Sequence, residues 1–255
     1  MHASASTVGL VIHVVALAGN GGNRARWAQL PQPLDNVVGT EIRLQGVSLP
    51  GFDGLALPHK NPTIDDFAAW LADAIDALDG PKVFFGTGIG GSIGLQAAQR
   101  AGLADAYIFH SPVGPNLDTR LLPKLMKPPL VRKAAKRLIG GPAGRVLLRR
   151  RFGNTLPPAA INDFAQGYLD CEAFEVMWDI LDADWFDALE PIAEPTALMW
   201  GAEDGVLGAD LAKDFSSVLP DAEVIIEETW GHYPMLEDPA GFSLSISGLS
   251  RRLLR

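Results

Sequence analysis

Short apolar runs of strand type alternate along this chain with segments in which apolar residues recur at helical spacing. This alternation predicts a mostly parallel sheet that is covered by helices on both faces. The predicted strands span residues 8–17, 37–44, 82–86, 105–110, 195–200 and 223–227. The predicted helices span residues 64–79, 90–101 and 209–218, followed by a closing helix from about Asp238.

The helix over residues 64–79 has the best-marked boundaries. Thr63 followed by Asp66 predicts a capping box at its start. Gly80 and Pro81 predict its end.

The alternation stops between Ser111 and Glu190, where the pattern is helical and interrupted by Pro and Gly. We therefore expect one domain, in which residues 1–110 and 191–255 form the core and residues 111–190 form a helical lid. In a parallel sheet such an insertion covers the carboxyl edge, where ligands bind.

Composition limits the classes of protein that fit. A chain of 255 residues buries enough surface to fold without a disulfide or a metal. Its one cysteine, Cys171, excludes an intrachain disulfide and favours a reducing cytoplasm. No run approaches the ~18 apolar residues of a membrane span. The net charge of −9 argues against a nucleic-acid partner.

The charge is unevenly distributed. Eleven of the 21 basic residues lie between Thr119 and Asn162, where no acidic residue occurs. This basic segment could attract an anionic substrate or lie on an acidic membrane surface. Charge runs are more often a solvated helix face, and that interpretation is favoured here. It places the cations opposite an apolar face made of Leu130, Val131, Ala134, Ala135 and Leu138.

Four short motifs occur at the ends of predicted strands. The first two are Leu17-Ala18-Gly19-Asn20-Gly21-Gly22 and Leu49-Pro50-Gly51-Phe52. The third, Phe85-Gly86-Thr87-Gly88-Ile89-Gly90-Gly91, lies between a strand and a helix. The fourth is a pair, Trp200-Gly201-Ala202-Glu203-Asp204 and Gly231-His232-Tyr233-Pro234.

In this order the motifs resemble those of the α/β-hydrolase superfamily, and they span nearly the whole chain. The resemblance implies an α/β-hydrolase fold, a mostly parallel central sheet flanked by helices with a helical lid inserted after the sixth strand. It also implies that Asp204 is the acid and His232 the base of a catalytic triad. The nucleophilic serine of the G-x-S-x-G elbow is replaced by Gly88.

The resemblance further implies an oxyanion hole made by the backbone N–H groups of Asn20 and Ile89. Five more residues are expected to line the pocket, namely Gly19, Thr87, His110, Ser111 and Tyr233. Because an acyl-serine cannot form at residue 88, the ordinary triad mechanism is excluded.

Three hypotheses remain. His232, oriented by Asp204, could act as a general base on water or on a substrate proton, with a small and largely apolar carbonyl or ester compound as substrate. The chain could instead be a catalytically inactive small-molecule-binding member of the fold. Finally, Gly88 could be a designed replacement of a serine.

Other nucleophiles and cofactors receive little support. Ser92 and Thr87 are weak candidate nucleophiles, and Cys171 is expected to be a small buried hydrophobic residue. The five histidines are scattered, so we expect no metal site and no organic cofactor.

Overall fold

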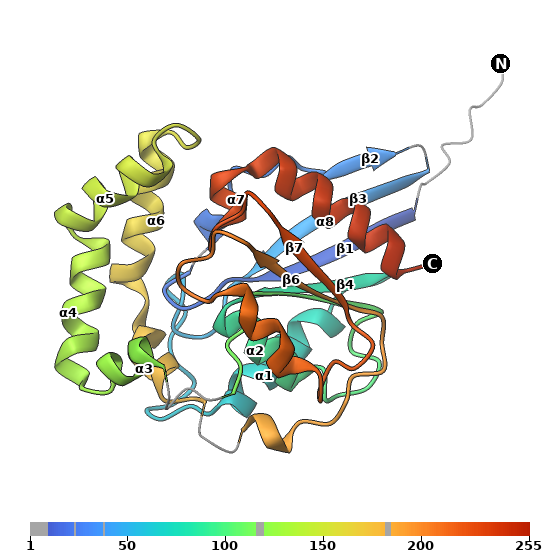
Figure 1. Ribbon diagram of the computed structural model, residues 1–255, viewed down its shortest axis with the longest axis horizontal. Coiled ribbons are helices and arrows are strands. Elements are labelled where there is room, and N and C mark those ends of the chain that lie inside the picture. Colours follow the sequence, from blue (N-terminus) through green and yellow to red (C-terminus); the bar gives the residue numbers. More distant parts are fainter. Residues whose placement is uncertain (1–9, 23, 38, 116–119, 182–184) are drawn as a thin grey trace.

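The computed structural model describes residues 10–22, 24–37, 39–115, 120–181 and 185–255. Its centre is a seven-stranded sheet with the strand order β2-β3-β1-β4-β5-β6-β7 (Figure 1). The strands are β1 Leu10–Leu17, β2 Asp35–Val37, β3 Thr40–Val47, β4 Lys82–Thr87, β5 Ala106–His110, β6 Thr196–Gly201 and β7 Glu223–Glu227.

All strands except β2 run parallel, which confirms the predicted mostly parallel sheet. Strands β5 and β6 are buried along their whole length, as continuous apolar runs in a sheet covered on both faces require. The single strand predicted at 37–44 is instead an antiparallel hairpin of β2 and β3. Residues 8 and 9 of the first predicted strand lie outside the described residues.

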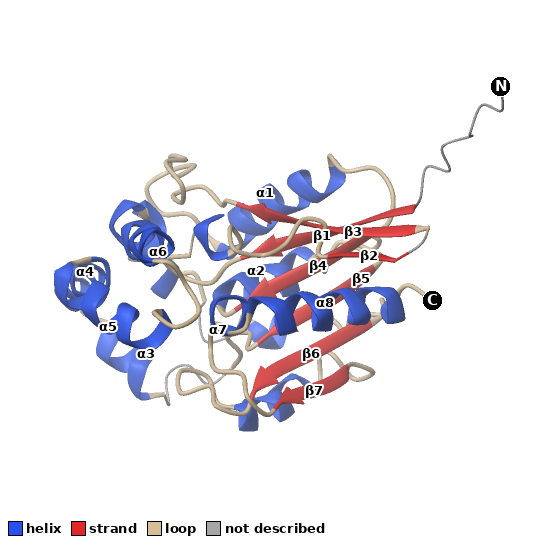
Figure 2. Cartoon of the chain, turned by 90° about the horizontal axis from the view of Figure 1, so that it is seen from above, coloured by secondary structure: helices blue, strands red, loops and turns tan. Residues whose placement is uncertain are grey.

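Helices cover both faces of the sheet. Helices α1 (Ile64–Asp76) and α2 (Ile89–Ala97) lie on one face, and α8 (Pro239–Leu253) lies on the other (Figure 2). The predicted capping box is confirmed, since the Thr63 side chain accepts from the Asp66 N–H and the Asp66 side chain accepts from the Thr63 N–H. The helix predicted at 209–218 is a 3₁₀ helix, η6 (Ala209–Phe215), in which Phe215 is the buried residue.

A helical segment, residues 111–190, connects β5 to β6. It contains α3 Leu121–Met126, α4 Pro129–Gly140, α5 Pro142–Phe152, α6 Pro158–Asp170 and the 3₁₀ turns η3 Glu172–Phe174, η4 Val176–Trp178 and η5 Phe186–Ala188. The arrows of the parallel strands point toward α3–α6, so these helices stand at the carboxyl end of the parallel sheet (Figures 1 and 2). The segment follows the fifth strand and not the sixth, because the described chain has only β1–β5 before it.

The orientation of α4 contradicts the predicted packing of its apolar face, although Lys133 and Arg137 are exposed as predicted. Leu130 is 80% exposed and Leu138 is 58% exposed, whereas Arg132 is buried. The Arg132 guanidinium donates to the carboxylate of Asp179 and to the carbonyl oxygen of Glu175, so a cation anchors the helix. The amphipathic pattern is correctly predicted, but the face that meets the protein is the opposite one.

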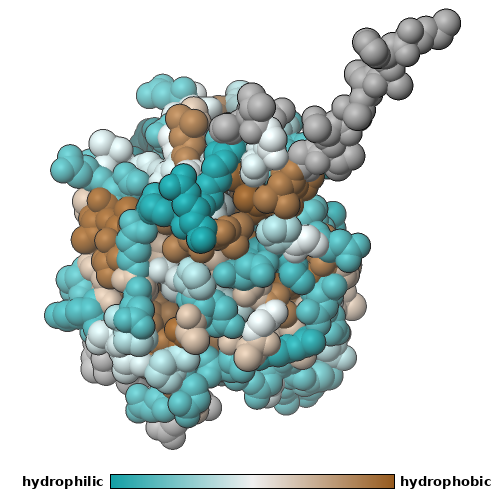
Figure 3. All heavy atoms as spheres, turned by 90° about the vertical axis from the view of Figure 1, so that its right-hand side faces the viewer, coloured by the Kyte–Doolittle hydropathy of each residue, from teal (hydrophilic) through white to brown (hydrophobic). Residues whose placement is uncertain are grey.

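None of the helices in the described part of the chain is both long and apolar enough to cross a membrane. At the end of the molecule opposite α3–α6, apolar groups are separated by polar side chains (Figure 3).

Candidate active site

The turn from β4 to α2 is built around Gly88. Its backbone has φ 57° and ψ −129°, a region that residues with a side chain rarely adopt. A Cβ atom added at Gly88 would contact only the Gly19 Cα, at 3.6 Å. The turn thus has the backbone path and the open space of a nucleophile elbow, but it carries no hydroxyl.

Asp204 and His232 form a hydrogen-bonded pair at the ends of β6 and β7. The His232 Nδ1 lies 2.8 Å from the Asp204 Oδ2. The other carboxylate oxygen, Oδ1, accepts from the backbone N–H groups of Val206 and Leu207, both at 2.8 Å. Burial alone would raise the pKa of Asp204, but the His232 hydrogen bond and charge and the two backbone donors outweigh it and lower the pKa.

Ser111 completes the surroundings of the acid. Its hydroxyl donates to the Asp204 Oδ2 at 2.9 Å, and its backbone has a positive φ of 42°. The sequence predicted that Ser111 lines the pocket. In the structure its hydroxyl lies against the carboxylate, where Ser111 and the imidazole of His232 both donate to the same oxygen.

Thr87 and His110 form a second buried pair beside this site. The Thr87 Oγ1 lies 3.1 Å from the His110 Nδ1, and the His110 ring stacks on Phe85. The His110 Nε2 is buried and has no hydrogen-bond partner among the described residues. Burial, together with the charge of His232, lowers the pKa of His110 to about 3, so the ring is neutral. Both side chains are buried, and their place in the lining of a pocket stays a prediction.

The strand register brings these pairs to one edge. Thr87 lies beside His110 and His110 beside Met199, while the Gly88 N–H donates to the His110 carbonyl oxygen at 3.1 Å.

The backbone N–H groups of Asn20 and Ile89 have no acceptor among the described residues. They are therefore available to an external oxygen atom.

The structure adds Arg26, which the sequence analysis missed. Arg26 is 2% exposed and its guanidinium lies over the rings of Phe164 and Tyr233, at 5.4 Å and 5.1 Å from the ring centres. Tyr233 also contacts the His232 ring edge-on at 4.8 Å. The signal available in the sequence was a basic residue directly before Trp27, a few residues after the first motif.

The helical segment is tied to the loops around the dyad. The Asn20 Nδ2 donates to the Phe174 carbonyl oxygen at 3.1 Å, and the Tyr168 hydroxyl lies 3.3 Å from that of Tyr233. The Thr155 hydroxyl donates to the Leu236 carbonyl oxygen at 2.9 Å.

Cys171 in this segment is buried. Burial raises the pKa of its thiol to about 12, so the thiol is unreactive at neutral pH.

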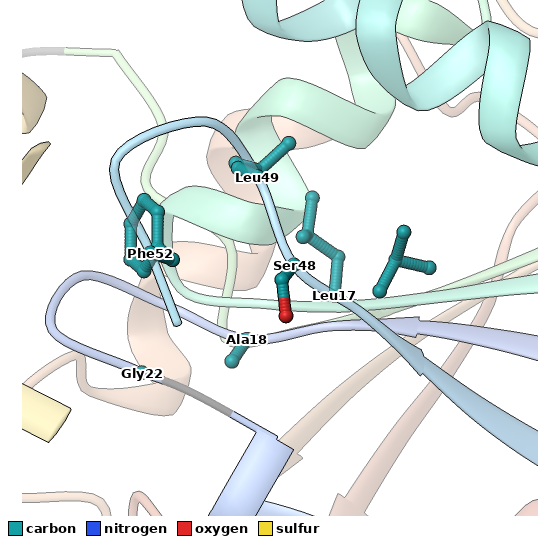
Figure 4. A pocket seen from close by; sticks show the side chains of 7 residues that line it. Leu17, Ala18, Gly22, Ser48, Leu49 and Phe52 are labelled. Carbon is teal, nitrogen blue, oxygen red and sulfur yellow. The ribbon is translucent and has the colours of Figure 1, made fainter. Parts of the chain in front are cut away.

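Two hollows lie beside these elements. A cavity of about 10 Å³, the size of one water molecule, lies between the loops after β1 and β3 and includes Gly22, Ser48 and Phe52 in its lining (Figure 4). An open groove of about 340 Å³ lies on the helical segment between Lys133, Lys136, Arg137, Leu169 and Glu175.

Comparison with known families decides the classification. The Alpha/beta hydrolase family matches residues 11–243. The chain belongs to this family. Among the residues described, no group of His, Cys, Asp or Glu is arranged to hold a metal ion.

Relatives and solved members of the family cover most of the chain. The pimeloyl-[acyl-carrier protein] methyl ester esterase of Aromatoleum aromaticum is 26% identical over 82% of this chain and 88% of its own length. A putative lipase from Acinetobacter baumannii has a TM-score of 0.74 at 19% identity, covering 97% of this chain and 85% of the lipase. An epoxide hydrolase from Vigna radiata has a TM-score of 0.75 at 18% identity, covering 96% and 92%. Both structural likenesses show the fold.

The lowered pKa of His110 predicts a loss of stability in mild acid. His110 stays neutral in the folded chain. In the unfolded chain it has the ordinary histidine pKa of 6.5 and binds a proton below that pH. The unfolding free energy should therefore fall as the pH drops below 6.5, with this histidine contributing up to about 1.4 kcal/mol per pH unit. Denaturant unfolding between pH 7 and pH 5 measures how the unfolding free energy changes with pH.

His110→Gln should remove the contribution of this histidine to that pH dependence. The control His59→Gln, at an exposed position, should leave the contribution in place. An unchanged pH dependence in His110→Gln would refute the assignment.

Proposed function

We propose that this chain acts on a small, largely apolar carbonyl or ester compound through a His232–Asp204 dyad and an oxyanion hole, without a serine nucleophile. The observation that carries the proposal is the dyad bond of 2.8 Å, in a family whose fold the chain shares. An ester-cleaving relative, the methyl ester esterase of Aromatoleum aromaticum, supports the substrate class.

The chemistry follows from the free ring nitrogen. Asp204 binds the Nδ1 side of His232, and the Nε2 has no partner among the described residues, so Nε2 is the base. It takes a proton from water as the water oxygen bonds to the carbonyl carbon. The carbonyl π electrons move to its oxygen, which the Asn20 and Ile89 N–H groups stabilise. When the tetrahedral intermediate collapses, the alkoxide leaves and takes that proton back.

The space at Gly88 is suited to the attacking water. A serine would place its hydroxyl near Gly19, where an added Cβ meets only one atom within 4 Å. The serine hydroxyls described near the turn are engaged elsewhere, since Ser92 donates to the Val113 carbonyl oxygen and Ser111 to Asp204. We infer that neither serine replaces the nucleophile.

The alternative is a member of the family that binds a small molecule and has no activity. The absence of a hydroxyl at Gly88 favours this alternative. The wild-type protein separates the two: hydrolysis of p-nitrophenyl butyrate that disappears in His232→Ala supports the water route, and no hydrolysis by either protein supports the binding protein.

Restoring the hydroxyl should restore the ordinary triad. Gly88→Ser is expected to raise kcat for p-nitrophenyl butyrate by at least ~100-fold over wild type, because the triad contributes far more than an oxyanion hole alone. Gly88→Ala is the matched control, since it imposes the same positive-φ strain without a hydroxyl. If Gly88→Ser is no faster than Gly88→Ala in this spectrophotometric assay, residue 88 is not the nucleophile position.

The acid should be needed for the orientation of the base. In the Gly88→Ser background, Asp204→Asn is expected to lower kcat by about 10⁴-fold, because it favours the wrong imidazole tautomer. Ser111→Ala, which removes the other donor to the same oxygen, should have a much smaller effect. An equal loss in both variants would show that Asp204 only stabilises the loop.

A further inference from the structure

Arg26 is a buried cation that has no carboxylate partner among the residues that the structure describes. Its Nη2 donates to the Asn20 carbonyl oxygen at 3.3 Å and to the Tyr168 hydroxyl at 3.4 Å. Its Nε is buried without any partner, and no hydrogen bond from its Nη1 occurs among the described residues. Burying an unpaired charge is unfavourable, so an arginine kept in this state is poised for an external anion.

The free Nη1 faces the candidate active site. A methyl group placed on Gly19 would lie 3.1 Å from the Thr87 carbonyl oxygen, 3.5 Å from the Arg26 Nη1 and 3.7 Å from the Gly88 Cα, so these three atoms border the same small space. The unpaired N–H groups at the start of α2 approach this space from the other side, where a helix N-terminus favours negative charge. The aromatic rings around the guanidinium, Phe164 and Tyr233, exclude water and strengthen its field.

We propose that Arg26 binds a carboxylate of the substrate, held beside the reacting carbonyl group. The position of the reacting group rests on the proposed function, whereas the binding of the anion does not. The substrate is then an apolar body with a carboxylate at one end.

Thermal unfolding tests this site without turnover. Sodium benzoate should raise the Tm of the wild-type protein by about 3 °C at ten times its dissociation constant, at constant ionic strength. Neutral benzamide should not. Arg26→Met should lose the benzoate shift, and Arg24→Met, an exposed arginine of the same turn, should keep it. Should Arg26→Met fail to fold, Arg26→Gln gives the same comparison.

No benzoate shift in wild type, or an equal shift in the Arg26 variants, would overturn the proposal. Because the assay needs no catalysis, its outcome is separate from that of Gly88→Ser.

A second inference comes from the outer surface of the helical segment. Eight of the fourteen large exposed hydrophobic side chains of the described residues lie within residues 121–147, namely Leu121, Leu122, Leu125, Leu130, Val131, Leu138, Val146 and Leu147. Helix α6 lies between α4 and α5 and the rest of the molecule, so α4 and α5 are outermost (Figure 1). Clustered apolar exposure of this kind marks an interaction surface.

The charge beside these apolar side chains indicates what kind of partner binds the surface of α3–α5. Lys133 and Arg137 are exposed on α4 and line the groove beside it together with Lys136, Leu169 and Glu175. Three other cations of the segment, Arg120, Arg132 and Arg151, are already paired with carboxylates, so the exposed cations of α4 supply the positive charge of this surface. Leucines that enter an acyl layer, next to cations that reach phosphate groups, match an anionic membrane surface. We infer that α3–α5 bind anionic phospholipid.

Vesicle co-sedimentation tests this surface. The protein should bind phosphatidylcholine vesicles that contain 30% phosphatidylglycerol and not vesicles of phosphatidylcholine alone. Leu130→Gln with Leu138→Gln, and separately Lys133→Gln with Arg137→Gln, should each lower the bound fraction at least fivefold. Val224→Gln with Ile226→Gln, on the edge strand β7 at 54% and 51% exposure, is the control and should bind like wild type.

Failure of the wild type to bind anionic vesicles at low salt, or equal binding by all variants, would overturn the inference. So would a dimer in size-exclusion chromatography that the leucine variants dissociate, because a second copy would then cover the surface. Competition by inorganic phosphate that abolishes vesicle binding without salt dependence would assign the groove to free phosphate.

Discussion

The buried carboxylate of Asp204 organises the carboxyl edge of the sheet. Among the described residues it accepts four hydrogen bonds, from His232, Ser111, Val206 and Leu207, which lie after three different strands. A carboxylate that is removed from water must be satisfied by such donors or become protonated. Because the buried Asp204 carboxylate needs these donors, it also fixes the loops that carry them, including the loop that holds the imidazole of His232. The arrangement of the site thus follows from the electrostatics of one side chain.

The elbow depends on the path of the backbone and not on a hydroxyl. Gly88 adopts the positive φ readily, and the N–H groups that would hold an oxyanion are set by β1, β4 and α2. The proposed acid, base and oxyanion site therefore do not depend on a hydroxyl at residue 88. Arg26 adds a positive charge to this arrangement, which links the site to the aromatic rings of the helical segment.

Much of the fold could be predicted because its signals are local. Apolar runs located β1 and β4–β7, a capping box located α1, and motif order identified Asp204 and His232 as partners. The sequence could not predict which face of α4 packs on the protein. An amphipathic pattern does not decide this, because the orientation depends on the ion pair between Arg132 and Asp179, which lies 47 residues further along the chain. Arg26, Ser111 and Thr87 acquire their partners only through tertiary packing, which sequence spacing does not encode.

The proposed function requires that residue 88 lie within reach of an activated imidazole. The most direct measurement is intact-mass analysis of Gly88→Ser after treatment with an alkyl fluorophosphonate, followed by peptide mapping. The account predicts one adduct per chain, located on residue 88, that wild type and Gly88→Ser with His232→Ala do not form. No adduct, or an adduct on another serine, would contradict it.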